Sequence, residues 1–436
     1  MKLPTSITRL VNLQSLYLEK LPRDMSKLVN LRHLKLAESK KLRHMPMGLG
    51  KLTDLRTLDT FIVGNQFDSE AGIMGRLADL NQLNNLSGNL DIEVRRESKY
   101  IALSEISATN LNMKENLREL NIRFENGTKE DKRVLECLKP PYNLKILKID
   151  GYGGERLPSW MMDSLHNHLP CLTMIKIKRC KSCKYLCSFG RLPHLEYLFL
   201  SGLDEVEYVA DNENELSQAP LFPSLIHLRV SVMPKLKGWW EMTSSEQDSK
   251  EDIQLHVQVQ HQHLVNWKPA FPKLRTLDVD SAELAITITR QQIGGFTSLK
   301  ELSISPSSIG EQSHQQQACT LPFSSCFPNL RLLEFWFLKI KVLPEGIRDL
   351  STLQTLKIYG LENIKEIPEW IDSLTSLQKL DFKRCQRLES LPHQIVNLPN
   401  LNTLSISLCD KLREKCQSPN GEYWHLIQHI PCLNIY

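Results

Sequence analysis

One motif, Leu-x-x-Leu-x-Leu, recurs along most of this chain and constrains its fold more than any other feature. Two weaker copies begin at Leu55 and Leu86. The clear copies begin at Leu13, Leu31, Leu117, Leu144, Leu172, Leu195, Leu225, Leu274, Leu299, Leu330, Leu353, Leu377 and Leu401. The last four copies start 23, 24 and 24 residues apart, an interval typical of a leucine-rich repeat.

The spacing within a copy predicts a short strand with one apolar face. Leu356 and Ile358 are two residues apart, so on a strand they point to the same side. One such strand is too small to fold alone, whereas stacked copies pair into a parallel sheet and merge their apolar faces. The return segment after this strand supplies Ile367, Ile371 and Leu374 for the opposite wall. We therefore predict an α/β leucine-rich-repeat solenoid, a horseshoe with the parallel sheet on its concave face.

The array is interrupted in places, and these interruptions suggest its organisation. Residues 243–252 and 310–317 are polar runs with nothing to bury, and Ile73, Leu77, Leu80 and Leu83 have helical spacing. The chain starts within a return segment, so we expect a preceding domain or partner to cover that end. The expected segments are N-terminal repeats (1–60), a helix-bearing insertion (61–116), central repeats (117–240), a polar loop (241–268), C-terminal repeats (269–409) and a cap (410–436).

Composition narrows the choice of partner. The 54 basic and 50 acidic residues nearly balance, giving a net charge of +4, so neither nucleic acid nor an acidic membrane is indicated as a partner. No run approaches the roughly 20 apolar residues of a membrane span, and the first residues lack the apolar core of a secretion signal. The 11 cysteines do not have the spacing of a disulfide framework. We expect a soluble, reduced, cytoplasmic protein.

Two clusters have the residue types of metal ligands. Thiolates at Cys180, Cys183 and Cys187 are spaced as zinc ligands can be. However, Cys180 lies eight residues after the start of its copy, as Cys385 and Cys409 do after theirs. This shared register favours a small buried side chain at an inward turn, and we prefer that interpretation. His256, His261 and His263 lack a recurring carboxylate or thiol, which favours a solvated strand or loop.

No arrangement of residues indicates catalysis or a bound cofactor. Neither a Ser-His-Asp set nor a pair of carboxylates stands out, so we predict that the chain is not an enzyme. Residues 48–52 (GLGKL) come nearest to a phosphate-binding loop. They lack its first glycine and its hydroxyl residue, and nucleotide binding is therefore not expected.

The positions between the core leucines give the best candidate for a functional surface, because they project from the other face of the sheet. Large aromatic and basic side chains at such positions commonly anchor protein interfaces. The candidate protein-binding residues are Lys148, Lys176, Phe199, Arg229, Trp336, Tyr359 and Lys383. The alternative is lateral self-pairing, in which Glu334, Lys357 and Asp381 neutralise one another and Tyr359 covers Lys383.

Several short motifs go beyond the generic repeat. They are 180–186 (CKSCKYL), 189–193 (FGRLP), 222–225 (FPSL), 233–236 (MPKL), 343–346 (LPEG), 367–371 (IPEWI) and 421–424 (GEYW). In this order, and over nearly the whole chain, they resemble motifs of the plant intracellular disease-resistance receptors of the coiled-coil, nucleotide-binding, leucine-rich-repeat class. Residues 73–92 also resemble an irregular insertion of that class.

This resemblance implies a role in recognition. The repeat region of such receptors recognises a pathogen effector or a guarded host protein and restrains a nucleotide-binding switch module. No phosphate loop is found in this chain, so the nucleotide-binding activity itself is not implied. The alternative is a freestanding intracellular scaffold or adaptor unrelated to defence, which would need its own N-terminal cap or recruiting motif.

Overall fold

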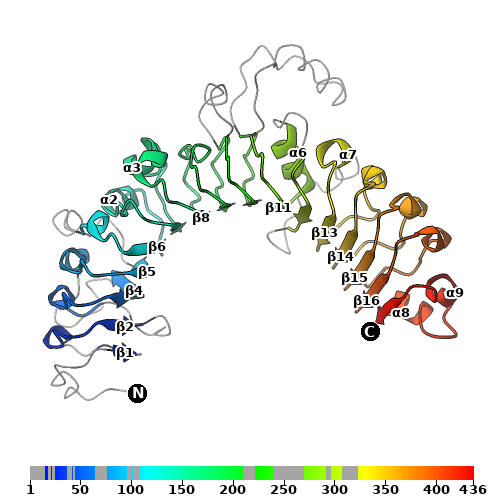
Figure 1. The fold of residues 1–436 in the computed structure, drawn as a ribbon, viewed down its shortest axis with the longest axis horizontal. Helices are drawn as coiled ribbons and strands as arrows, with labels where there is room; N and C mark the ends of the chain where they lie inside the picture. Colours follow the sequence, from blue (N-terminus) through cyan, green and yellow to red (C-terminus); the bar gives the residue numbers. More distant parts are fainter. Residues whose placement is uncertain are drawn as a thin grey trace, which may run out of the picture. The chain divides into compact units, whose positions relative to one another are not determined.

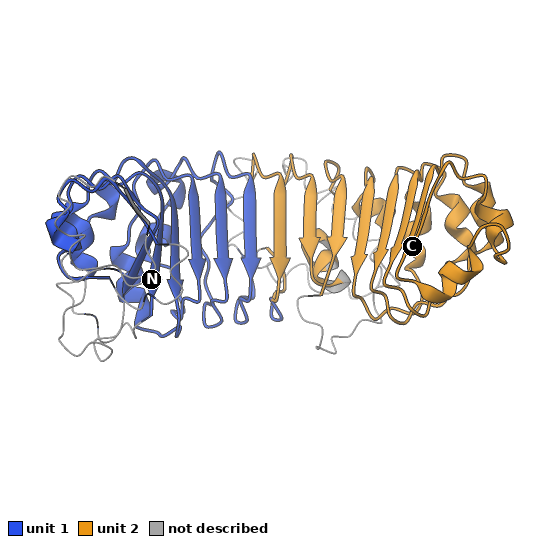
Figure 2. Cartoon of the chain, turned by 90° about the horizontal axis from the view of Figure 1, so that it is seen from below, with its two compact units in different colours: residues 1–212, 233–235 blue, residues 213–232, 236–436 orange. Residues whose placement is uncertain are grey.

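The computed structural model describes residues 15–17, 21, 25–36, 42, 45–63, 76–95, 101, 109–209, 221–239, 270–290, 296–306 and 323–436. The chain forms two compact units, shown in two colours in Figure 2. Unit 1 comprises residues 1–212 and 233–235, and unit 2 comprises residues 213–232 and 236–436. Each unit is described by itself below.

Unit 1 is built on parallel strands that pair with their neighbours in chain order. A first sheet contains β1 (Ser15–Tyr17), β2 (His33–Lys35) and β3 (Thr57–Leu58). A second ladder contains β4 (Thr60–Val63), β5 (Gly88–Val94), β6 (Leu117–Phe124), β7 (Ile146–Asp150), β8 (Met174–Lys178) and β9 (Tyr197–Ser201). The returns contain η2 (Met25–Lys27), η3 (Leu49–Lys51), η5 (Leu77–Gln82), η7 (Leu111–Met113), α2 (Asp131–Cys137), α3 (Ser159–Met162) and α4 (Leu165–His168).

Unit 2 repeats the same plan, with strands along one side and helical returns along the other (Figure 1). Its strands are β10 (His227–Ser231), β11 (Thr276–Val279), β12 (Glu301–Ile304), β13 (Leu332–Trp336), β14 (Thr355–Tyr359), β15 (Lys379–Lys383), β16 (Thr403–Ser407) and β17 (Cys432–Ile435), all parallel. Its helices are α6 (Ala282–Arg290), α7 (Phe323–Cys326), η12 (Glu345–Asp349), η13 (Glu369–Ser373), η14 (His393–Asn397), α8 (Asp410–Lys415) and α9 (Trp424–Ile427).

The core follows the leucine pattern. On β14 the side chains of Leu356 and Ile358 are fully buried, while Thr355, Lys357 and Tyr359 keep partial exposure. In the return that follows β14, the side chains of Ile367, Ile371 and Leu374 are buried as the sequence predicts. Burial of an aliphatic side chain stabilises a fold by roughly 1.5–3 kcal/mol. Because the side chains of one repeat are buried only when neighbouring repeats cover them, a repeat gains this stability only within the stack. The predicted leucine-rich-repeat fold with parallel strands is confirmed.

A backbone position just after many of the strands adopts a left-handed conformation. In unit 2, φ at Phe337, Gly360, Arg384 and Leu408 lies between 51° and 66°. The first three donate their N–H groups to the carbonyl oxygens of Tyr359, Lys383 and Ser407, at 2.7, 2.7 and 2.9 Å. These hydrogen bonds extend the ladder one residue beyond each strand, which is why the turn repeats even where glycine is absent.

The C-terminal segment, predicted from the sequence as a cap, contains two helices and a strand. Helices α8 and α9 are followed by β17, which pairs in parallel with β16 from Thr403↔Cys432 to Ile406↔Ile435. This strand lacks the full leucine motif, so periodicity alone does not predict it. The division of the array into six segments remains a proposal. The polar runs at residues 241–268 and 310–317 lie outside the described residues.

Lys114 occupies a core position that holds leucine in other returns. Like Leu52, Leu83 and Leu138, it closes a helical turn, and its side chain is fully buried. Its Nζ atom lies 3.4 Å from Oδ1 of Asn84, a long contact for a buried ammonium. Burial lowers the pKa of Lys114 to about 8.

We expect Lys114→Met to raise the free energy of unfolding at pH 7 by about 2 kcal/mol, after discounting for solvent screening. The pKa of Lys114 in the folded state lies below its unfolded value. The cost of burying the charged lysine therefore lowers the free energy of unfolding by its full amount below pH 8. The gain from Met should therefore shrink as pH rises from about 8 to the unfolded pKa of 10.5. Urea unfolding at pH 7 and pH 10 checks this; equal gains at both would contradict a buried charge.

Candidate protein-binding surfaces

The central outward row of unit 1 contains three of the candidates predicted from the sequence. Lys148, Lys176 and Phe199 are direct partners in the register of β7, β8 and β9. Lys148 forms an ion pair with Glu119 at 2.5 Å, from Nζ to Oε1. The Nζ atoms of Lys176 and Lys178 lie 4.7 and 4.8 Å from the centroid of the Phe199 ring. The ring therefore carries two ammonium groups on the sheet surface, a cation–π arrangement.

A second outward row runs two residues further along the same strands. In it Glu93, Arg123, Asp150 and Lys178 alternate in sign across the register of β5 to β8. Opposite charges side by side stabilise a sheet surface, each pair by roughly 0.2–1 kcal/mol. This row is largely self-neutralised.

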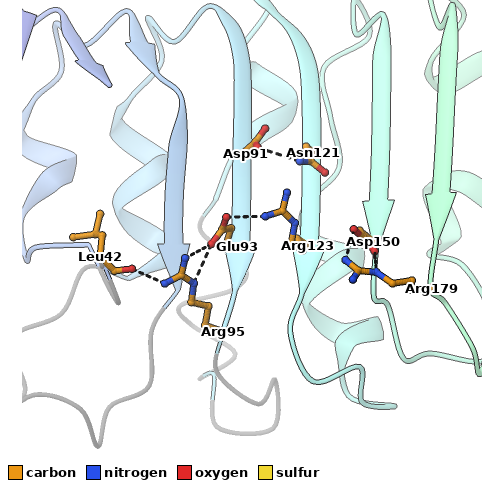
Figure 3. Close-up of polar contacts among 8 residues, drawn as sticks. All are labelled: Leu42, Asp91, Glu93, Arg95, Asn121, Arg123, Asp150 and Arg179. Carbon is orange, nitrogen blue, oxygen red and sulfur yellow. Dashed lines mark hydrogen bonds and ion pairs between the residues drawn. The ribbon is translucent and has the colours of Figure 1, made fainter. Parts of the chain in front are cut away.

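Two arginines that follow strands extend these contacts, as Figure 3 shows. Arg95 donates to Oε2 of Glu93 at 2.9 Å from Nε and also to the carbonyl oxygen of Leu42. The other Glu93 oxygen accepts from Arg123 at 2.9 Å. Arg179 donates to both Asp150 carboxylate oxygens, at 2.7 and 2.6 Å, and this pairing raises the pKa of its guanidinium.

A cleft of about 610 Å³ lies beside these arginines. Its lining includes more basic than acidic side chains. The charged lining residues are Glu93, Arg95, Arg123, Glu125, Arg179 and Lys181. The sequence analysis did not predict this cleft. Its charged lining comes from the second outward row and from arginines just after the strands, and those positions were not considered as candidates.

Glycines and one buried carboxylate shape part of the cleft wall. A Cβ atom on Gly153 would lie 2.1 Å from the carbonyl carbon of Gly127, so the loops after β6 and β7 touch backbone to backbone. The Asp131 carboxylate, only 2% exposed, accepts hydrogen bonds from the N–H groups of Thr128 (2.9 Å) and Gly153 (3.0 Å). These contacts fix the loops rigidly against each other.

Two titratable groups of unit 1 respond to burial. Burial raises the pKa of Asp91, although Asn121 donates a hydrogen bond to its carboxylate at 3.1 Å. Burial also raises the pKa of Tyr152, whose hydroxyl donates to the carbonyl oxygen of Arg156 at 2.6 Å. Both groups are held by hydrogen bonds within unit 1.

In unit 2, Arg229 is exposed on β10 and lies opposite Asp278 of β11 in the register. Burial raises the pKa of Asp278, and the nearby Arg229 charge works in the opposite direction. Arg229 thus occupies the outward position predicted for it, beside a carboxylate. Its part in binding stays a prediction.

The outward face of β13 to β15 contains the other candidates, and here one part of the alternative, the pairing of Glu334 with Lys357, is seen. Lys357 forms an ion pair with Glu334 at 2.7 Å, and the Tyr359 hydroxyl donates to Asp381 at 2.9 Å. Trp336 donates from its ring nitrogen to Glu334 at 3.1 Å. The carboxylates of this face are therefore satisfied within the sheet.

The aromatic candidates of this face pack against one another. The rings of Trp336 and Tyr359 meet edge to face with centroids 4.3 Å apart. Lys383 Nζ lies 5.9 Å from the centroid of the Tyr359 ring. This contact agrees with the alternative interpretation, in which Tyr359 covers Lys383. Burial, followed by the Asp381 hydrogen bond, raises the pKa of Tyr359. The three side chains form one preordered surface, which is compatible with both interpretations.

The cysteine cluster is part of the core. Cys180, Cys183 and Cys187 are at most 1% exposed, and Cys385 and Cys409 are fully buried, as the inward-turn interpretation predicts. Burial raises the pKa of Cys183 to about 12. Within the described ranges, no group of three or more His, Cys, Asp or Glu side chains is arranged to hold a metal ion. His256, His261 and His263 lie outside those ranges.

The described helices are all too short or too polar to span a bilayer.

Two family models match the chain. A model described as R13L1/DRL21 LRRs matches residues 77–203, and one described as a leucine-rich repeat region matches residues 310–418. Among solved structures, a leucine-rich-repeat protein of Leptospira interrogans is similar over 99% of this chain and 92% of its own, with 18% identity and a TM-score of 0.38.

Curated relatives come from plants. The putative disease resistance protein RGA1 of Solanum bulbocastanum is 32% identical over 70% of this chain and 29% of its own length. RGA4 of the same species is 37% identical over 45% of this chain and 19% of its own length. The putative disease resistance RPP13-like protein 1 of Arabidopsis thaliana is 28% identical over 66% and 28%, respectively. The chain thus spans less than a third of each of these relatives.

Proposed function

We propose that this chain, a leucine-rich-repeat region of the plant disease-resistance class, senses a pathogen effector or a guarded host protein and restrains a nucleotide-binding switch module. The partner in either role is a protein, held on the outward face of the sheet. The proposal includes action in the cytoplasm, where the switch module of such receptors operates.

The observation that carries this proposal is the character of the outward faces. Phe199 beneath two lysines in unit 1, and Trp336 against Tyr359 in unit 2, place large aromatic rings on rigid strands. Preordered aromatic and basic side chains lose little entropy on binding and commonly dominate protein interfaces.

Charge on unit 1 supports a protein partner further. Its carboxylates Glu93, Asp150 and Glu119 are each engaged by a basic side chain. A surface of such fixed, opposite charges favours selection among partners by complementary potential.

Restraint can be tested by co-expression in leaf cells. The nucleotide-binding module of a receptor of this class, in a form that triggers cell death alone, is expressed with and without this chain. We expect the chain to bind the module and reduce cell death, and Lys148→Glu with Lys176→Glu to weaken binding by about tenfold or more. A matched control is Lys129→Glu, an exposed lysine off this row. Absence of both binding and suppression would contradict the restraint.

A further inference from the structure

The row of residues just after β13 to β16 presents side chains that the turn itself does not require. The left-handed conformation at this row suits glycine, which occupies it at Gly360. Phe337, Arg384 and Leu408 occupy the same row with φ of 51°, 56° and 54°. Side chains are strained in this conformation. Arg179 after β8 and Val232 after β10 adopt it as well, with φ of 51° and 52°, so strain is general to these turns and the explanation for the exposed side chains lies in what they contact.

Core packing does not provide the explanation. Phe337 is 39% exposed and Leu408 is 53% exposed, and Arg384 is also exposed. By contrast, the residues just before them on the inward side, such as Phe335 and Ile406, are at most 1% exposed. Each of these side chains therefore costs backbone strain and leaves much of its apolar surface in water.

Phe337 joins the aromatic pair already described. A Cβ atom on Gly360 would lie 2.3 Å from Cδ1 of Phe337, so the Phe337 ring covers the backbone of the neighbouring turn because that residue is glycine. The centroids of Phe337 and Trp336 are 6.4 Å apart, and Trp336 packs against Tyr359. The result is one continuous surface, here named the edge patch: Trp336, Phe337, Tyr359, Lys383, Arg384 and Leu408.

The charge of the edge patch is positive. Lys383 and Arg384 are both exposed, and neither has a carboxylate partner among the residues that the structure describes. The nearest carboxylates on the face, Glu334 and Asp381, are already engaged by Lys357 and Tyr359. Two residues beyond this row lie the carboxylates of Glu362 and Asp410 and the ammonium group of Lys339. Asp410 lies 3.5 Å from Arg413.

We propose that the edge patch is the docking site for an extended acidic segment of a partner protein that presents its carboxylates between two apolar side chains. One apolar side chain packs against Phe337 and Trp336, the other packs against Leu408, and the carboxylates between them meet Lys383 and Arg384. Strands spaced about 4.8 Å apart place Phe337 and Leu408 roughly 14 Å from each other, a span of four or five extended residues. This inference rests on the proposed protein-binding function and names the chemistry of the partner.

The test uses the full chain and a display library of random peptides as the probe. Selection should enrich peptides with Leu, Phe or Trp on both sides of Asp or Glu. The affinity of the chain for these peptides should fall by about tenfold in Phe337→Gly and in Arg384→Asn. Glycine and asparagine are chosen because both fit a left-handed turn. The melting temperature of Phe337→Gly should not fall, because glycine relieves the strain.

Two variants serve as matched controls. Val396→Ser removes an apolar side chain that is 45% exposed on η14, and Arg348→Gln removes an arginine that is 52% exposed on η12. Both should change affinity by less than about twofold. A loss of affinity in the controls equal to that in the patch variants would overturn the proposal.

Several other results would also overturn it. They are selection of no peptides, selection of basic peptides, or peptides that bind Phe337→Gly as tightly as the original chain. Self-association that Phe337→Gly abolishes would assign the patch to a second copy of the chain. If the chain restrains the nucleotide-binding module but selects no peptide, only this inference is wrong. If the chain selects acidic peptides but does not restrain the module, only the restraining role is wrong.

Discussion

Phe335→Ala is expected to lower the free energy of unfolding by about 3–5 kcal/mol, the usual cost of removing a buried phenylalanine. Phe335 is 1% exposed on β13 and lies between Ile304 and Ile358 in the register of the neighbouring strands. Its removal opens a cavity that stacked repeats cannot close by moving one side chain. Urea unfolding followed by circular dichroism measures the loss.

The control for this prediction is Lys379→Ala on β15. Its side chain is 41% exposed and lies 3.8 Å from Asp381, so its removal should cost less than about 0.5 kcal/mol. A Phe335→Ala variant as stable as this control would show that the strands do not share one packed interior.

Gly153→Ala should cost about 3 kcal/mol, near the upper range for overpacking. The added Cβ atom would lie 2.1 Å from the Gly127 carbonyl carbon and 2.2 Å from the Thr128 nitrogen, and backbone atoms cannot rotate away. The loops after β6 and β7 must therefore separate. Hydrogen exchange at the N–H of Gly153, which donates to Asp131, should quicken together with the loss of stability.

Gly88→Ala is the informative comparison. Gly88 has a φ of +79° but nothing within 4 Å of an added Cβ atom. That substitution should cost only the 1–2 kcal/mol or so of a strained left-handed residue. If Gly153→Ala cost no more than Gly88→Ala, the close contact between the two loops would not be rigid.

Most of the fold follows from the sequence because its signal is periodic and local. Leucines two residues apart predict which side of a strand is buried, and copies in step predict parallel pairing. The structure bears this out at Leu356, Leu380 and Leu404, which are direct register partners. The strand β17 escaped prediction because it is held by pairing with β16, and its own residues lack the repeated motif.

The outward rows could also be predicted, whereas the contacts within them could not. Alternation puts Trp336 and Tyr359 side by side, as the register shows. The hydrogen bonds from Trp336 to Glu334 and from Tyr359 to Asp381 depend on side-chain rotamers, which periodicity does not fix. Three residues of the edge patch, Phe337, Arg384 and Leu408, were missed for a further reason. Alternation along the strand would place them on the inward side, but the left-handed turn exposes them.

In our proposal the outward face is available to partners, while the inward face holds the fold together. The most direct measurement is the unfolding free energy of Trp336→Ala, taken alongside its affinity for an acidic peptide selected on the full chain. Trp336 keeps partial exposure on β13, so we predict a loss of stability below about 1.5 kcal/mol with a fall in affinity of about tenfold or more. A loss of stability as large as that of Phe335→Ala, with unchanged affinity, would contradict the account.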